Sequence, residues 1–342
     1  MVRESARLGT TQPSFEIASE TLNRLGRVGI SDTTVWRHHQ EVTGRIEAEL
    51  ERQESAGRVF WGNGEERLKV HEAIEGHCSV SIDGAMVLIR GEGYREVKIV
   101  SVSEVVVEES ADGGKQGGGR EASGSGTGQE KRGRQDGLKL VHHSYRAVLG
   151  DKATFEPALK GELARRRVEQ AVKVSTVNDG AEWIWDLVQK HLPEKRVEIL
   201  DWPHALENLA KAAHAAWGED SQEAQDWLEE RASELWNGER MGLEIALYKL
   251  PRRYKERGKA IRQVKEYFDK HWARIEYDRF RAEGRPIGSG TVESAAKNVV
   301  QWRMKRGGQR WSRSGATRML AALGEVHSTR WQTIPQCLAK AA

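Results

Sequence analysis

The sequence has little cysteine and no long hydrophobic run. Cys78 and Cys337 are the only cysteines, too few for a zinc ribbon or a disulfide framework, and this fits a reducing compartment. No apolar stretch approaches the length of about 18 residues that marks a transmembrane helix. Residues 1–20 also lack the apolar core of a secretory signal. We therefore expect a cytoplasmic protein, associated with the nucleoid and without a membrane partner.

An excess of charge of either sign is also missing. The 54 Lys and Arg residues nearly balance the 51 Asp and Glu residues, which gives a net charge of +3. A charge this small does not by itself identify a nucleic-acid partner. The chain is 38% hydrophobic and 31% charged, as in soluble globular proteins with some disordered sequence. Its length favours about two domains.

The N-terminal residues predict two helices, over 14–25 and from residue 32 onward, separated by the turn sequence GRVGIS. The apolar faces consist of Phe15, Ala18, Leu22 and Leu25 in the first helix and Val35, Val42 and Ile46 in the second. Ser31 can cap the second helix. We predict a helix-turn-helix segment over 1–50 with Arg37 and His38 on its outer, DNA-facing side. An ordinary αα-hairpin fits this stretch equally well.

At His77 the hydrophobic period changes to two, after a helical linker over 51–76. The pattern predicts an antiparallel meander of three strands, over 77–83, 85–90 and 94–107. Residues 108–137 are rich in Gly, Ser and charge, which predicts a flexible loop. The alternation then continues with a helix, a strand, a helix and a strand, over 151–170, 171–178, 181–193 and 196–200.

This β-β-β-α-β-α-β order is the topology of the ribonuclease-H-like fold. We therefore predict an α/β protein whose core covers residues 77–201. The helical pattern that follows predicts an all-α insertion over 202–285. The core is completed over 286–325, and residues 326–342 form a C-terminal tail.

Three acidic residues occupy special places in this topology: Asp83 and Asp179 end the first and fourth predicted strands, and Glu293 lies on a later helix. The first and fourth strands are neighbours in such a sheet, so the aspartates are expected side by side. Clustered carboxylates repel one another without a cation, and Mg²⁺ binds carboxylates together with waters and phosphate oxygens. We predict a catalytic metal site for Mg²⁺, with Mn²⁺ as a substitute. Taken alone, each Asp-Gly pair favours a simple turn.

A basic stretch follows Glu293, because residues 294–324 contain no Asp or Glu. Its predicted DNA contacts are Lys297, Arg303, Lys305, Arg306 and Arg310. Trp302 and Trp311 are interleaved with them, and basic residues beside aromatics suit phosphates and unstacked bases. Lys297 follows Glu293 by four residues, which predicts the same helix face. A solvated basic face is the alternative.

The sequence Asp201-Trp202-Pro203-His204 directly follows the last predicted strand. His204 is a candidate catalytic residue that contacts the scissile phosphate or positions DNA. Asp201 is a supporting candidate, although Asp followed by Pro is also the usual start of a helix. By this chemistry alone, a helix cap is the better interpretation of Asp201.

Several segments resemble bacterial insertion-sequence DDE transposases of the ISKra type and, more distantly, the Mutator-like group. The matching segments, within residues 77–331, are SIDGAMVLIRGEGYREVKI, STVNDGAEWIWDLVQKHLP, VEILDWPHALENLAKAA, RPIGSGTVESAAKNVVQWRMKRGGQRWS and STRW. The resemblance implies a ribonuclease-H-like core with an all-α insertion, a metal-binding triad of Asp83, Asp179 and Glu293, and a functional His204. Members commonly carry an upstream segment with paired cysteines, and no CxxC motif occurs in this sequence.

The resemblance also implies an activity. Such enzymes cleave double-stranded DNA at the ends of their element with water, and the freed 3′-hydroxyl then attacks target DNA. They act as homo-oligomers. Two further readings stay open: a truncated or repurposed transposase-derived DNA-binding protein without catalysis, and a general nuclease of the same fold. Strand joining at element ends distinguishes an active transposase from both of these alternatives.

Overall fold

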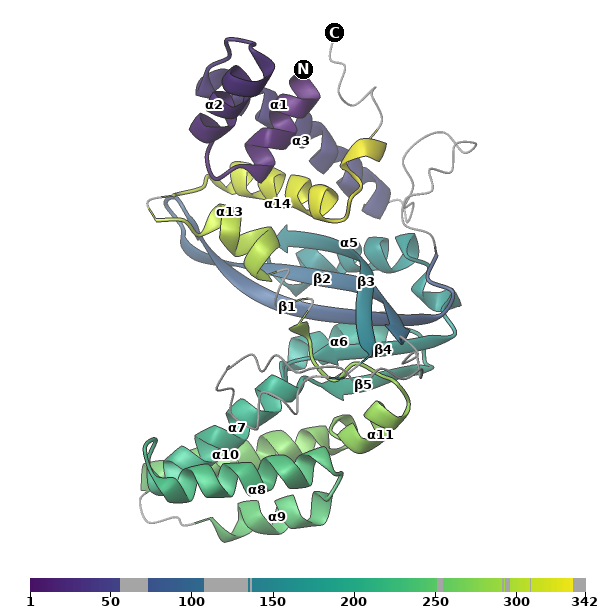
Figure 1. Cartoon of the computed structure of the whole chain (residues 1–342), viewed down its shortest axis with the longest axis vertical. Helices are drawn as coiled ribbons and strands as arrows, with labels where there is room; N and C mark the ends of the chain where they lie inside the picture. Colours follow the sequence, from purple (N-terminus) through teal and green to yellow (C-terminus); the bar gives the residue numbers. More distant parts are fainter. Residues whose placement is uncertain are drawn as a thin grey trace, which may run out of the picture.

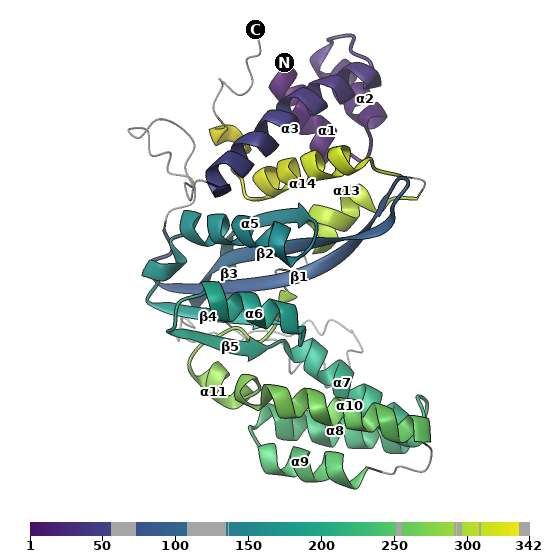
Figure 2. The ribbon, with the colours of Figure 1, turned by 180° about the vertical axis from the view of Figure 1, so that it is seen from behind.

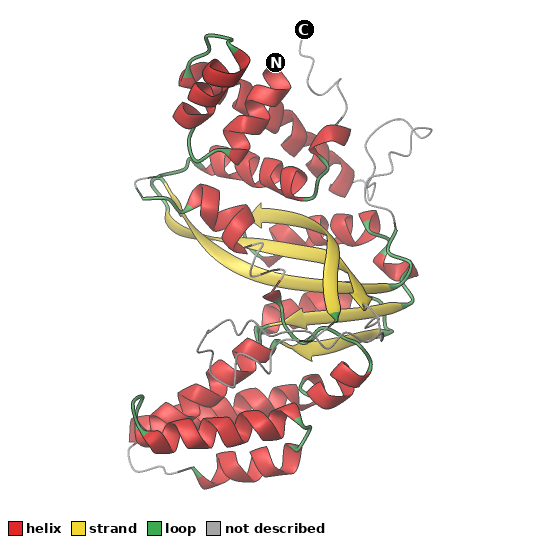
Figure 3. Ribbon diagram, in the orientation of Figure 1, coloured by secondary structure: helices red, strands yellow, loops and turns green. Residues whose placement is uncertain are grey.

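The computed structural model describes residues 1–55, 73–107, 135, 137–250, 255–290, 292, 296–307 and 309–334. The molecule is layered along its long axis, with a five-stranded sheet between two groups of helices (Figures 1 and 3). One group consists of α1 (Val2–Thr11), α2 (Phe15–Gly26), α3 (Asp32–Ser55) and α14 (Arg313–His327). The other consists of α7 (Trp202–Trp217), α8 (Gln222–Trp236), α9 (Arg240–Lys249) and α10 (Lys255–His271).

The sheet has the strand order β3-β2-β1-β4-β5. Its strands are β1 (His77–Ile89), β2 (Gly93–Val107), β3 (Leu138–Leu149), β4 (Lys173–Asn178) and β5 (Arg196–Leu200). The first three strands are antiparallel, whereas β4 runs parallel to β1 and to β5. Helices α5 (Lys152–Arg165) and α6 (Glu182–His191) provide the connections to the two parallel strands. The chain is therefore α/β, with the predicted order of strand and helix types and with β1 beside β4.

The predicted strand boundaries in the meander were wrong. β1 continues through Asp83 and Gly84, which pair with Ile99 and Lys98 of β2. The chain reverses only at residues 90–92, after Ile89. The segment 138–149, to which the sequence assigned no strand, forms β3. Asp-Gly is favoured in turns, but thirteen consecutive pairings between β1 and β2 keep the strand extended here.

The two faces of the sheet carry separate apolar clusters. On one face, Cys78, Val80 and Ile82 of β1 pack with residues of α5 and α6. On the other face, Ala85, Val87 and Ile89 pack with Val292 and with α14. Side chains alternate between faces along a strand, so Asp83 lies on the same face as Ala85 and Val87. Figure 2 shows α5 and α6 covering the face opposite to α13 (Trp302–Met304).

Cys78 is buried and free. Burial raises the pKa of its thiol to about 12, so the group is unreactive at neutral pH. Cys337 lies outside the described residues.

The N-terminal helices pack directly on the core. Val42, Ile46 and Leu50 of α3 join Ala321 and Ala322 of α14 in one buried cluster. The predicted helices correspond to α2 and α3, and the Ser31 hydroxyl accepts from the Thr34 amide at 3.2 Å as a cap. Helix α1 was not predicted, and Leu25 was wrongly placed on the buried face, because its side chain is 75% exposed.

The described residues between Trp202 and Ala282 form mainly helices, as predicted, with η2 (Trp272–Arg274) and α11 (Tyr277–Ala282) after α10. Trp202 is buried and its ring lies edge-on to Trp236 and Tyr277, at 5.3 and 5.0 Å between centroids. These aromatic contacts attach the helical group to the end of β5. None of the helices in the described ranges has both the length and the hydropathy of a membrane span.

A buried cluster of ion pairs joins α5, α14 and Arg330, which follows α14. Arg330 Nη1 donates to Glu162 Oε1 at 2.8 Å, and Arg330 Nη2 lies 3.1 Å from Glu325 Oε1. Arg165 Nη1 donates to Glu162 at 2.9 Å. All four side chains are 4% exposed or less. We call this set the Arg330 cluster.

Candidate active site

Asp83 and Asp179 follow neighbouring residues at the place where the pairing of β1 with β4 ends. The parallel register pairs Val80 with Thr176, and two residues further on the Ile82 amide donates to Asn178 Oδ1 at 2.7 Å. Asp83 directly follows Ile82, and Asp179 directly follows Asn178. This hydrogen bond, made by a fully buried Asn178 side chain, fixes the two aspartates at neighbouring positions. The prediction that Asp83 ends its strand was wrong, but its proximity to the end of β4 holds.

Neither Asp-Gly pair forms a turn that needs left-handed glycine. Gly84 lies within β1, and Gly180 links β4 to α6 without a positive φ. Gly180 is required for space instead, since a Cβ there would lie 2.1 Å from a ring carbon of Tyr267 in α10. The Tyr267 ring therefore packs directly on the backbone beside Asp179. Burial, and then the charges of Asp179 and Asp201, raise the pKa of Tyr267, which keeps the phenol neutral.

Asp201 connects three segments at this edge. Its backbone amide donates to the Asn178 carbonyl at 2.8 Å. Its Oδ1 accepts from the Ser289 amide at 2.5 Å, and its Oδ2 accepts from the His204 amide at 3.1 Å. The side chain is fully buried and caps α7, as its helix-start sequence favoured. The prediction of a helix cap is therefore confirmed, and the same carboxylate also holds the Ser289 amide.

His204 is held as a cation. Its Nδ1 lies 2.6 Å from Asp201 Oδ2, and this hydrogen bond raises the pKa of His204 to about 9, against partial burial and with help from the charges of Asp201 and Asp179. The side chain is 36% exposed. A partly exposed imidazolium that feels the charge of Asp179 is suited to contact an anionic ligand at the same edge.

Glu293 lies outside the described residues, so its side chain is not placed. Described residues just before it define the course of the chain up to this point. Ser289 is bonded to Asp201, as above, and Val292 packs on the β1 face that carries Asp83. Among the described residues, no group of three or more His, Cys, Asp or Glu side chains is arranged to hold a metal ion. The described part of the predicted triad supplies two carboxylates.

The basic stretch divides into exposed and buried residues. Lys297, Lys305, Arg306 and Arg310 are exposed. Arg303 is not available on the surface as predicted, because it is 1% exposed and donates to the Gly9 carbonyl at 3.2 Å. Lys297 lies in a π-helix, η3 (Ala296–Gln301), whereas Glu293 lies outside the described residues, so the expected shared helix face of the two stays a prediction.

The two DNA contacts predicted in the N-terminal helices, Arg37 and His38, differ in their exposure. Arg37 is exposed on α3, as predicted for a residue that faces a ligand. His38 is half-buried and its Nδ1 lies 3.1 Å from Ser5 Oγ of α1. His38 therefore faces the neighbouring helix, because α1, which the sequence did not predict, covers that side of α3.

Asn178 and Tyr267 were missed by sequence reasoning. Asn178 directly precedes Asp179 in a buried strand, and a polar residue there is a local signal that such an analysis can use. Tyr267 gives no such signal, because it lies 88 residues from Asp179 in a plain helical pattern. Comparison of the chain with protein-family models and with curated proteins finds no match.

Proposed function

We propose that this chain is a DDE-type DNA transposase, a metal-dependent polynucleotidyl transferase with a ribonuclease-H-like core. It cleaves double-stranded DNA at the ends of an insertion sequence and joins the freed 3′-hydroxyl to target DNA. The observation that carries the proposal is the Ile82–Asn178 hydrogen bond, which joins the residue before Asp83 in β1 to the residue before Asp179 at the end of β4. The sheet order β3-β2-β1-β4-β5 further supports the ribonuclease-H-like assignment.

The donor set fits a hard divalent cation. Mg²⁺ is held in proteins by a few carboxylates, with waters and substrate phosphates completing its coordination. Asp83 in β1 and Asp179 directly after β4 are the two proposed carboxylate ligands from the sheet, and Glu293 is the proposed third ligand. When bound, such ions activate the attacking oxygen and stabilise the leaving oxygen of a phosphoryl transfer.

The other residues at this edge position the DNA. The His204 imidazolium is proposed to contact a phosphate, using its second ring N–H while Nδ1 stays on Asp201. Asp201 is a positioning residue, because its carboxylate orients His204 and also holds the Ser289 amide. Tyr267, whose ring packs on Gly180, is proposed to keep water from one side of Asp179. Exposed Lys297, Lys305 and Arg306 add positive charge for the duplex backbone.

The proposal is tested by a strand-cleavage assay on the DNA that flanks this reading frame, with Mg²⁺ or Mn²⁺ against EDTA. We expect metal-dependent nicks at a defined boundary. Asp179→Asn removes a charged ligand and is expected to lower the cleavage rate at least about a hundredfold, as losses of groups that stabilise a transition state do. A second assay with pre-nicked ends measures strand joining.

Asp186→Asn is the matched control. Asp186 lies on α6, seven residues after Asp179, is 61% exposed and pairs only with Lys152 among the described residues, so its substitution should leave cleavage unchanged. Salt-sensitive DNA binding without cleavage, by wild type and by Asp179→Asn alike, would instead favour a transposase-derived DNA-binding protein without catalysis. Cleavage without a defined boundary and without joining would favour a general nuclease.

A further inference from the structure

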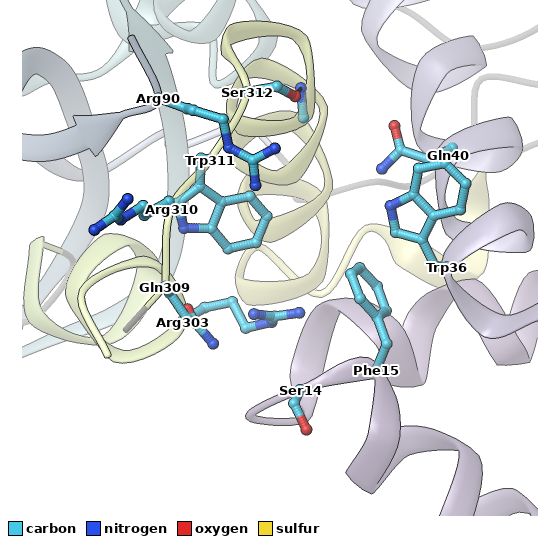
Figure 4. Close-up of a pocket in the computed structure, with 11 residues that line it drawn as sticks. Ser14, Phe15, Trp36, Gln40, Arg90, Arg303, Gln309, Arg310, Trp311 and Ser312 are labelled. Carbon is cyan, nitrogen blue, oxygen red and sulfur yellow. Dashed lines mark hydrogen bonds between the residues drawn. The ribbon is translucent and has the colours of Figure 1, made fainter. Parts of the chain in front are cut away.

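A pocket of about 410 Å³ lies where the N-terminal helices meet the tip of the β1–β2 hairpin and the loop before α14. In Figure 4, Trp311 lies on one side of this pocket, and Trp36 and Phe15 lie on the other. The guanidinium groups of Arg90 and Arg303 lie between the two sides. No Asp or Glu is among the residues that line it. The pocket is therefore aromatic and cationic.

Arg303 is a buried cation that has hydrogen-bonding capacity left over among the described residues. Its Nη2 donates to the Gly9 carbonyl, and its guanidinium carbon lies 5.1 and 5.2 Å from the ring centroids of Phe15 and Trp311. Its Nε is buried and has no hydrogen-bond partner in the described part of the chain. Burying a cation without a counter-charge is costly, so an anion in this pocket would find a prepared partner.

The pocket also offers an acceptor and fixed aromatic faces. The amide nitrogen of Gln309 donates to the Pro13 carbonyl at 3.0 Å, whereas its Oε1 is buried without a described partner. The Trp311 indole N–H donates to the Met304 carbonyl at 3.2 Å, and Trp311 forms a backbone bridge with Ile89. Its ring is thus held in place. Trp36 is 48% exposed and its ring is open to a ligand.

The geometry points to a binding site for one unpaired nucleotide of a DNA strand, with its base between Trp311 and Trp36 and its phosphate beside Arg303 and Arg90. A bare phosphate would use the guanidinium groups but neither the aromatic faces nor the Gln309 oxygen. A base in a stacked duplex would not reach between the two indoles. The inference rests on the proposed function, because it requires that the chain binds DNA, and it adds that one nucleotide is taken out of the helix.

The test is an equilibrium binding measurement by fluorescence anisotropy, with the full chain and without divalent metal. Three labelled duplexes are compared at one salt concentration: a fully paired duplex, the same duplex with one unpaired nucleotide, and that duplex with an abasic site at the unpaired position. We expect the unpaired nucleotide to bind about tenfold more tightly than the other two, in line with the effect of stacking one base on an aromatic side chain. The abasic duplex retains the phosphate, so it separates base binding from phosphate binding.

Two tryptophan variants locate the effect. Trp36→Ala is expected to abolish the preference for the unpaired nucleotide, and Trp36→Phe to retain part of it. Trp302→Ala is the matched control, because Trp302 is 42% exposed in the same basic stretch but does not line the pocket. Since Trp36 and Trp302 are both partly exposed, neither alanine variant is expected to impair folding.

Equal affinity for the paired and unpaired duplexes overturns the inference and leaves the proposed function standing. Equal affinity for the abasic and unpaired duplexes also overturns it, because the site would then bind phosphate only. Loss of the preference in Trp302→Ala but not in Trp36→Ala assigns the base to another surface and overturns it as well. Conversely, a nucleotide preference without metal-dependent cleavage supports the pocket and contradicts the transposase proposal.

Discussion

Two arginines of this chain are equally inaccessible to solvent, yet their surroundings differ. Arg330 is 0% exposed and contacts the carboxylates of Glu162 and Glu325. Arg303 is 1% exposed and is surrounded by Phe15, Trp311 and a backbone carbonyl. A buried charge that is paired inside the protein contributes to folding, whereas one that is left without a counter-ion is available to a ligand. The contrast separates a structural cluster from a candidate binding pocket.

The largest expected change in stability comes from removing Arg330, the arginine that is paired with carboxylates. Arg330→Met leaves Glu162 and Glu325 buried with less compensating charge, and removal of one partner of a buried pair costs about 3–5 kcal/mol. We expect the free energy of unfolding, measured by urea denaturation at pH 7, to fall by that amount. Arg318→Met is the control on the same stretch of chain. Arg318 is 35% exposed and lies 3.4 Å from Glu47, so its loss should cost at most about 1 kcal/mol.

Acid should remove the same stabilisation without any mutation. Burial alone raises the pKa of Glu162, but the charges of Arg330 and Arg165 outweigh it and hold the pKa below the usual 4.5. The folded-state pKa is depressed, so this contribution is present above pH 4.5 and is lost as pH falls toward the folded value. We expect the difference in unfolding free energy between wild type and Arg330→Met to shrink from pH 5 to pH 3. A constant difference over that range would contradict the role given to Glu162.

The sequence predicts the parts of the fold that local periodicity determines. The helices α2, α5 and α6 and the strands β4 and β5 lie within a few residues of their expected positions. The continuity of β1 through Asp83-Gly84 could not be predicted, because the dipeptide favours a turn locally and only the pairing with β2 keeps it extended. β3 was missed because exposed positions, among them His142, interrupt its apolar pattern.

Burial of charge was the least predictable property of the candidate sites. Arg303 stands in a run of cations, which indicates a solvated surface when only the local sequence is considered. It is buried by contacts with Gly9 and Phe15, which lie nearly the whole length of the described chain away. Asp201 was predictable as a helix cap from its neighbours. Its bond to Ser289 depends on the tertiary structure.

In its surroundings His204 is intermediate between Arg330 and Arg303. Its partner Asp201 is buried, whereas His204 itself is partly exposed. Its pKa is raised to about 9 by the hydrogen bond with Asp201. The raised value means that this pair stabilises the fold fully below pH 6.5 and loses that contribution as pH rises through about 9. With solvent screening we expect a loss of about 1 kcal/mol, and an imidazole titration near pH 9 by NMR. Asp201→Asn keeps a capping side chain and should move that titration back toward 6.5.

The smallest expected change in stability is that of the matching substitution at the other buried arginine, Arg303. Arg303→Met removes a buried cation that has no carboxylate partner in the described part of the chain, and replacing buried charge by an apolar side chain of similar length is often neutral or stabilising. The lost hydrogen bond to Gly9 opposes this gain, so we expect the unfolding free energy to stay within about 1 kcal/mol of wild type. The same urea titration measures both arginine variants. A loss as large as that of Arg330→Met would mean that Arg303 is compensated within the protein, and its burial would then have a structural explanation and no longer favour a ligand.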